Sequence, residues 1–219
     1  MKNLEQFFDM RYTDNTEVCA KKKDICIERL LKEITENLGK HYNILDLGCG
    51  TGVYTKKMLH KNTTVTGSDF SEVALSKLPN NMTAVKSDVS KSMPFDSNSF
   101  DVIMLMDIIE LVPDLILFLN EIKRIIKKDG LIIGCVPNSN FLLNHLKILF
   151  TGKSISQIFY GTHTRFYSKN YLYEIFNKDG FELDDFEGIT GIKRNLNYVR
   201  RSPFCLLSRD FYFSTRVIK

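Results

Sequence analysis

The sequence predicts an α/β protein built on a doubly wound, mostly parallel sheet. Short apolar stretches rich in β-branched residues recur at 43–47, 64–69, 83–86, 101–106 and 131–136, as expected for buried strands. Segments with helical spacing of apolar residues lie between several of them, which is the alternation typical of this fold class. The chain has 219 residues, 43% of them hydrophobic and 26% charged, so it can bury one sizeable core. We therefore expect a single Rossmann-like domain over residues 1–219.

Two helices can be placed around these strands. The first is expected over 16–38, where apolar residues recur at helical spacing, and residues 1–40 would form a cap over the sheet or the ligand. The second, before the last predicted strand, is apolar at 115, 119, 122, 125 and 126. Its basic residues Lys123, Arg124, Lys127 and Lys128 precede Gly130, as at a helix C-terminus, so we expect the helix to extend that far.

A glycine-dense turn follows the first predicted strand. Asp46 ends the apolar run, and glycines at 48, 50 and 52 let a nucleoside-type ligand approach the backbone. A dinucleotide fingerprint would have glycine at position 53, which is Val53 here, and a pyrophosphate would be repelled by the Asp46 carboxylate. A ligand that carries an ammonium and a sulfonium would be attracted. The turn therefore favours S-adenosylmethionine over NAD.

Acidic residues also end the next two predicted strands. Asp69 lies 17 residues after Gly52, and Asp88 follows 19 residues later. A carboxylate at the end of the second strand can accept hydrogen bonds from both ribose hydroxyls, and one after the third can accept from the adenine amino group. After the central apolar strand, Met106 and Asp107 would lie at the carboxyl edge of the sheet, where they could border the transferable methyl group or only line the cofactor.

These motifs resemble the class I S-adenosylmethionine-dependent methyltransferases. The resemblance covers about 40–137, through Leu45–Gly52, Gly67–Ser71, Ser87–Val89, Ser99–Glu110 and Leu119–Ile133. A looser likeness, in 136–139, Gly152 and 163–168, is to the methionine-biosynthesis W-type methyltransferases and their relatives in glycan and quinone pathways. The resemblance implies a seven-stranded sheet whose last strand is antiparallel. Many relatives have histidine where this chain has Leu111.

The predicted cofactor site combines the turn, the strand-end acids and their neighbours. Asp46 and the turn would hold the methionine portion of S-adenosylmethionine, Asp69 the ribose, and Asp88 with Val89 the adenine. The predicted cofactor-binding residues are Asp46, Gly48, Cys49, Gly50, Gly52, Asp69, Phe70, Asp88, Val89 and Met106. We expect Cys49 to act as a small residue that fits the turn. The five cysteines lack metal-ligand spacing, so no metal site is expected, and they favour a reducing, cytoplasmic location.

Residues 138–167 interrupt the alternation and form a predicted lid after the fifth strand. The segment 140–150 reads as a short helix with a wide apolar surface, which could dock on the core, line an apolar substrate pocket, or touch a membrane or partner. No segment reaches the length of apolar residues that a membrane span needs. His163, near the expected substrate entrance, is the candidate general base, because an unperturbed imidazole titrates near neutral pH.

Residues 181–219 are expected to form a C-terminal hairpin. From 188 onward they hold seven basic residues and one acid, which could steer an anionic, sugar-type acceptor or only form a solvated surface. Recognised nucleic-acid motifs do not accompany this charge, so no nucleic-acid partner is expected. The predicted function is methyl transfer by in-line displacement to a small-molecule or glycan-precursor acceptor, through a hydroxyl. The alternative is a non-catalytic, S-adenosylmethionine-binding accessory protein that regulates a partner enzyme.

Overall fold

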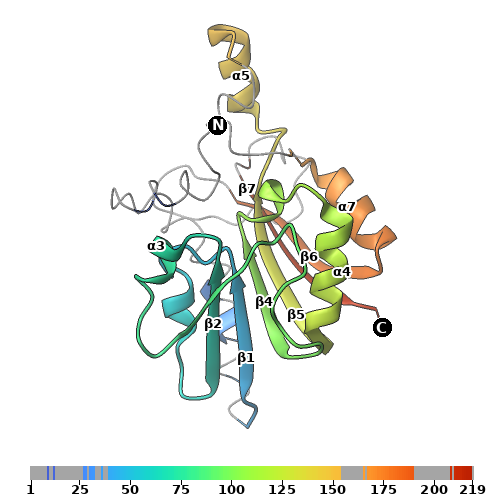
Figure 1. Ribbon diagram of the computed structural model, residues 1–219. Helices are drawn as coiled ribbons and strands as arrows, with labels where there is room; N and C mark the ends of the chain where they lie inside the picture. Colours follow the sequence, from blue (N-terminus) through green and yellow to red (C-terminus); the bar gives the residue numbers. More distant parts are fainter. Residues whose placement is uncertain are drawn as a thin grey trace.

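The computed structural model describes residues 39–153, 165, 167–189, 208 and 210–218, together with eight residues before position 39 (9, 12, 27, 28, 30–32 and 36). Seven strands form one sheet in the order β3-β2-β1-β4-β5-β7-β6 (Figure 1). Their bounds are β1 Tyr42–Leu47, β2 Thr63–Asp69, β3 Thr83–Lys86, β4 Phe100–Met106, β5 Ile126–Pro137, β6 Phe181–Ile189 and β7 Asp210–Val217. The predicted fold class is thereby confirmed.

The first five strands are parallel, and the last strand reverses. β1 pairs with both β2 and β4, β2 pairs with β3, and β4 pairs with β5, all in parallel. β7 runs antiparallel to β5 and to β6, between which it is inserted. The predicted antiparallel last strand is confirmed, and the carboxyl ends of β1 to β4 meet at one edge of the sheet.

Successive residues of each central strand enter different hydrophobic clusters. Ile44 lies in a cluster with Val102 and Met104, whereas Leu45 lies in the other cluster with Ile103. This separation follows from the two-residue period of a strand, which points neighbouring side chains to opposite faces. Both faces of the sheet are therefore covered, as the near-continuous apolar strands predict.

Helices α4 (Leu115–Ile125) and α7 (Lys169–Lys178) supply side chains to the cluster that contains Leu45. On the other face the cluster includes Ile27 and Leu30, which are helical residues within the predicted N-terminal helix. The described part also contains helix α5 (Leu142–Thr151), which follows β5, and three shorter helices: the 3-10 helices η2 (Thr55–Met58) and η3 (Ile109–Leu111), and α3 (Glu72–Leu75). None of the described helices is long and apolar enough to cross a bilayer.

The expected C-terminal end of α4 was wrong. The helix ends at Ile125, and Lys127 and Lys128 belong to the beginning of β5. Tertiary contacts explain the difference, because Ile126 is buried and pairs with Phe100, while Lys127 Nζ donates to Asp101 Oδ2 at 2.7 Å. A helix continued through these residues would lose both interactions.

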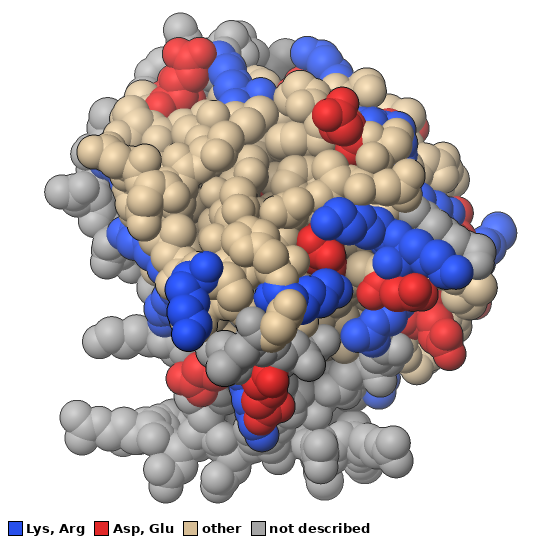
Figure 2. Space-filling view, turned by 90° about the horizontal axis from the view of Figure 1, so that it is seen from below, with Lys and Arg blue, Asp and Glu red and all other residues tan. Residues whose placement is uncertain are grey.

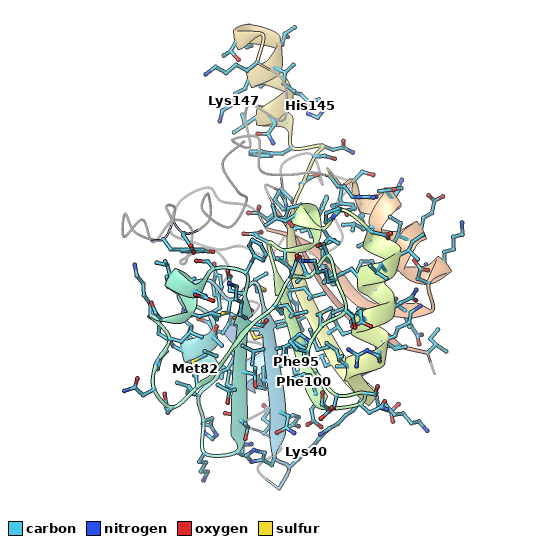
Figure 3. The ribbon with its side chains drawn as sticks, viewed as in Figure 1. Lys40, Met82, Phe95, Phe100, His145 and Lys147 are labelled. Atoms are coloured by element: carbon cyan, nitrogen blue, oxygen red, sulfur yellow. The ribbon has the colours of Figure 1, made fainter. Side chains whose placement is uncertain are left out.

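The amino ends of the parallel strands form a face that carries both signs of charge. Figure 2, which views the molecule from this end, shows Lys and Arg residues beside Asp and Glu residues. Asp101 is among the acids at this end, with Lys40 Nζ 3.6 Å from its Oδ1. Figure 3 shows Lys40 at this end of the sheet. Phe95 packs edge-on against Phe100 close by, with their ring centroids 5.3 Å apart. This end is thus closed by packing and ion pairs.

Gly134 is expected to be intolerant of any side chain. A Cβ there would lie 2.2 Å from Phe213 Cζ and 3.0 Å from the backbone oxygen of Leu105. Gly134→Ala should therefore destabilise the protein by about 1–3 kcal/mol through overpacking between β4, β5 and β7. Chemical denaturation measures this change. Gly39→Ala is the matched control, since nothing lies within 4 Å of a Cβ at Gly39, and equal stability of the two variants would contradict the assigned packing.

Candidate cofactor and acceptor site

The glycine turn after β1 requires left-handed backbone at three positions. Gly48, Gly50 and Gly52 have φ values of 72°, 53° and 76°. A Cβ at Gly48 would lie 2.7 Å from Ile108 Cδ1, and one at Gly52 would lie 2.5 Å from Leu78 Cδ2. The left-handed conformation therefore favours glycine at these positions, and a Cβ would in addition displace the ends of the Ile108 and Leu78 side chains. Cys49, between them, is buried and packs into the core, and burial first, then the charge of Asp46, raises the pKa of its thiol.

Asp46 lies beneath this turn with an oxygen available for a ligand. Its side chain is 1% exposed, and Thr55 Oγ1 donates to Oδ2 at 2.5 Å. Oδ1 is also buried, and no hydrogen-bond partner for it occurs among the described residues. Burial raises the pKa of Asp46 to about 7. The hydrogen bond from Thr55 lowers this pKa, and the charge of Asp69 raises it. An ammonium group at Oδ1 would donate to this oxygen and lower the pKa of Asp46.

Asp69 joins the end of β2 to the glycine turn. Its Oδ2 accepts from the backbone N–H of Gly50 at 2.8 Å, and its Oδ1 accepts from that of Ser71 at 2.9 Å. Each carboxylate oxygen has two lone pairs, so both can still accept a ribose hydroxyl. Burial raises the pKa of Asp69, and the nearby charge of Asp9 raises it further. The backbone hydrogen bonds lower this pKa but do not cancel the rise.

The end of β3 supplies a more exposed acid. Asp88 Oδ1 accepts from Ser90 N at 3.0 Å and from Ser90 Oγ at 2.6 Å, and its Oδ2 lies 3.1 Å from Lys91 Nζ. Burial favours the neutral form, but the bonds from Ser90 and the charge of Lys91 outweigh it and lower the pKa of Asp88. The neighbouring Val89 packs against the core, whereas Phe70, after β2, is half-buried.

Two residues of the N-terminal part lie against the turn region. Ser71 Oγ donates to Asp9 Oδ1, and Lys77 Nζ donates to the backbone oxygen of Tyr12 at 2.5 Å. A Cβ on Gly50 would lie 3.1 Å from the Tyr12 hydroxyl oxygen. Sequence patterns missed Asp9 and Tyr12 because their partners Gly50, Ser71 and Lys77 lie 38 to 65 residues away in the chain. Thr55 was also missed, although a hydroxyl nine residues after Asp46 was a detectable signal.

The carboxyl end of β4 forms the remaining wall. Met106 is 6% exposed, and Asp107 has a φ of 58°, an unusual conformation for a residue other than glycine. Residues from the end of the predicted lid reach this edge. Arg165 N donates to the Glu110 backbone oxygen at 3.2 Å, and the Tyr167 hydroxyl donates to that of Ile109 at 3.4 Å. The sequence indicates Arg165 and Tyr167 only through the family resemblance over 163–168.

The structure thus brings most of the predicted site residues to one edge of the sheet. Asp46, the glycine turn, Asp69, Asp88 and Met106 end or follow the adjacent strands β3, β2, β1 and β4. His163 lies outside the described residues, so its role stays a prediction. Two buried carboxylates with raised pKa values beside a glycine cradle suit a cationic nucleoside ligand and disfavour a pyrophosphate. The residues present therefore fit S-adenosylmethionine.

Comparison with known proteins identifies the family. A family model described as a methyltransferase domain matches residues 20–185. A ubiquinone biosynthesis O-methyltransferase of Pelagibacter ubique is 27% identical over 157 residues, which are 68% of this chain and 65% of that protein. A demethylmenaquinone methyltransferase of Staphylococcus haemolyticus is 32% identical over 51% of this chain and 49% of its own length. The match thus spans less than two thirds of either relative.

A solved structure supports the same fold. It is an S-adenosylmethionine-dependent methyltransferase of Thermotoga maritima, described as a possible histamine N-methyltransferase, with a TM-score of 0.67 and 18% identity. The superposition covers 98% of this chain and 99% of that one. The predicted resemblance to class I methyltransferases is therefore confirmed, whereas the likeness to the W-type and glycan subgroup is not.

The affinity for S-adenosylhomocysteine should rise with pH because its ammonium group favours ionised Asp46. With a pKa of about 7 in the free protein, binding should strengthen about tenfold between roughly pH 6 and pH 8. Calorimetric titration at several pH values measures this slope. Asp46→Asn should abolish it, and Thr55→Val, which removes a bond to the ionised form, should move its midpoint upward. A flat profile for the natural protein would contradict the assigned contact.

Asp69→Ala should weaken S-adenosylhomocysteine binding by about 1–3 kcal/mol, because ribose hydroxyls would lose their acceptor. Asp101→Ala is the matched control, since this buried carboxylate accepts from Asn43 N and Lys127 Nζ at the opposite end of the sheet. The Asp101 substitution should lower thermal stability and leave the affinity for S-adenosylhomocysteine unchanged. Equal affinities of the Asp69 variant and the natural protein, with both folded, would refute the ribose assignment.

Proposed function

The chain belongs to the methyltransferase domain family, and from this premise we propose that it methylates a hydroxyl group of a small, apolar acceptor. When bound, S-adenosylmethionine supplies an activated methyl group. The observation that carries the proposal is the buried Oδ1 of Asp46, which has no hydrogen-bond partner among the described residues and lies beneath a turn of three left-handed glycines. That arrangement suits the ammonium end of this cofactor.

The residues of this chain would contribute binding and alignment. Asp46 would hold the ammonium group, Asp69 the ribose hydroxyls, and Asp88 with Val89 the adenine. Met106, at the end of β4, would border the methyl group, so that an acceptor placed beside this strand end meets it in line. Such positioning can lower a barrier by roughly 7–11 kcal/mol in favourable cases. His163 would accept the proton of the attacking hydroxyl.

The acceptor class is proposed from the relatives and the local chemistry. The names of the two relatives refer to ubiquinone and demethylmenaquinone, and one specifies O-methylation. Buried apolar side chains, among them Met106 and Ile108, lie at the end of β4. These observations favour a phenolic, quinone-like hydroxyl. The sugar-type or anionic acceptor gains no support from the relatives, and the cytoplasmic location remains a prediction.

The test is a methyl-transfer assay with the purified full chain. A catechol that bears a short isoprenoid tail serves as one acceptor and a sugar nucleotide as the other, with S-adenosylhomocysteine as the measured product. Methylation of the catechol alone is the expected result. Methylation of the sugar nucleotide alone would overturn the acceptor class. Tight S-adenosylhomocysteine binding without turnover on either would instead favour the non-catalytic accessory function.

His163→Ala should leave S-adenosylhomocysteine binding nearly unchanged and slow transfer to the hydroxyl about 10²-fold or more, because the general base is lost. His41→Ala is the matched control. His41 directly precedes β1, at the opposite end of the sheet from the site, and its Nε2 lies 2.8 Å from Oγ1 of Thr64 in β2. Single-turnover rates separate chemistry from binding. If the His163 variant transfers the methyl group at the single-turnover rate of the natural protein, the base lies elsewhere or is unnecessary.

A further inference from the structure

Helix α5 (Leu142–Thr151) projects from the body of the protein beyond the carboxyl edge of the sheet (Figure 1). Asn144 is its only buried residue. The His145 and Thr151 side chains form hydrogen bonds with backbone oxygens of the same helical segment, at Phe141 and Lys147. A ten-residue helix is marginal in water unless it packs its apolar face. Of the three uses expected for this segment, docking on the core is therefore not what the structure shows.

The exposed apolar residues of α5 form one stripe. Their spacing is i, i+1, i+4, i+7 and i+8, which at 3.6 residues per turn covers about a third of the helix circumference. The stripe consists of Leu142 (40% exposed), Leu143 (50%), Leu146 (38%), Leu149 (75%) and Phe150 (80%). His145 and Lys147 flank it and point to opposite sides of the helix (Figure 3). This is the arrangement of a helix that lies in the plane of a membrane surface.

The sequence on both sides of α5 is basic, which favours an anionic surface. Residues 130–173 contain no aspartate or glutamate, but they include Lys147, Lys153, Arg165 and Lys169. The opposite end of the molecule carries both signs of charge (Figure 2). Lysines beside an apolar stripe can extend their ammonium groups toward lipid phosphates while the stripe enters the acyl boundary. An anionic bilayer therefore matches α5 in both charge and polarity.

The size of the stripe argues against a stable protein interface. A ten-residue helix is about 15 Å long and offers a single stripe, whereas a stable interface needs about 800 Å² per partner. A bilayer has no such requirement, because it closes around whatever apolar surface enters it. We propose that α5 docks this protein on membranes that contain anionic phospholipids. The cofactor residues lie toward the same end of the sheet, so docking would bring the site close to the lipid.

Vesicle flotation with the full chain tests this proposal, and it needs no methyl transfer, so its outcome is independent of the proposed function. The vesicles are phosphatidylcholine alone, or equimolar phosphatidylcholine and phosphatidylglycerol. The natural protein should float with the second kind at least tenfold more than with the first. A variant with Leu149→Ser and Phe150→Ser should float with the phosphatidylglycerol vesicles at least tenfold less than the natural protein. Lys147→Ala with Lys153→Ala should reduce only the preference for phosphatidylglycerol.

The matched control replaces two exposed apolar residues elsewhere. Ile116 and Leu117 on α4 are 63% and 44% exposed, so Ile116→Ser with Leu117→Ser should leave flotation unchanged. An unchanged circular dichroism spectrum and thermal unfolding midpoint verify that each variant is folded. The proposal is overturned if the natural protein does not float, or if the α4 variant loses as much binding as the α5 variant. It is also overturned if the natural protein is a dimer that the α5 substitutions convert to a monomer.

Discussion

The parallel register of β1 between β2 and β4 is the constraint on which the site depends. It pairs Asp46 with Gly67 on one side and with Met104 on the other. The same register brings Asp69, at the end of β2, within 2.8 Å of the Gly50 backbone nitrogen. A shift of the pairing by one residue would turn every side chain on β1 to the other face of the sheet, and Asp46 would no longer lie beneath the glycine turn. The glycine turn is therefore anchored by sheet pairing as well as by its own sequence.

Two buried aspartates of this sheet show how location decides the behaviour of a carboxylate. Asp101, at the amino end of β4, is 9% exposed, and although burial opposes ionisation, the bonds and charges of Lys127, Asn43 and Lys40 outweigh it and lower its pKa. Asp46 is 1% exposed and its pKa is raised to about 7. Asp101 thus stabilises the fold above its unfolded pKa, whereas Asp46 costs stability as the pH rises from about 4 to about 7. The protein keeps the costly carboxylate at the edge where a cationic ligand can compensate it.

The sequence predicted the strands, the glycine turn and the strand-end acids because local signals encode them. Alternating and continuous apolar stretches identified β1 to β5, and their order brought Asp69 and Asp88 to the edge that holds Asp46. The missed features depend on contacts distant in the chain. Ion pairing between Lys127 and Asp101 sets the end of α4, and the approach of Tyr12 to Gly50 has no local signature. The sequence left the course of α5 open among three uses, because the apolar surface of a short helix does not by itself specify what covers it.

The chemistry of β4 explains why acceptor activation is assigned to the predicted lid. Leu111, where many relatives carry histidine, packs against the core and offers no proton acceptor. Among the described residues, the histidines lie in other places: His41 precedes β1, His60 precedes β2, and His145 lies on the projecting α5. Asp46 titrates near neutral pH, but it is buried beneath the turn and bound by Thr55, so its charge serves ligand binding. Of the four histidines in the sequence, His163 therefore stays the predicted base for a hydroxyl acceptor. Arg165 and Tyr167, close to His163 in sequence, contact the end of β4.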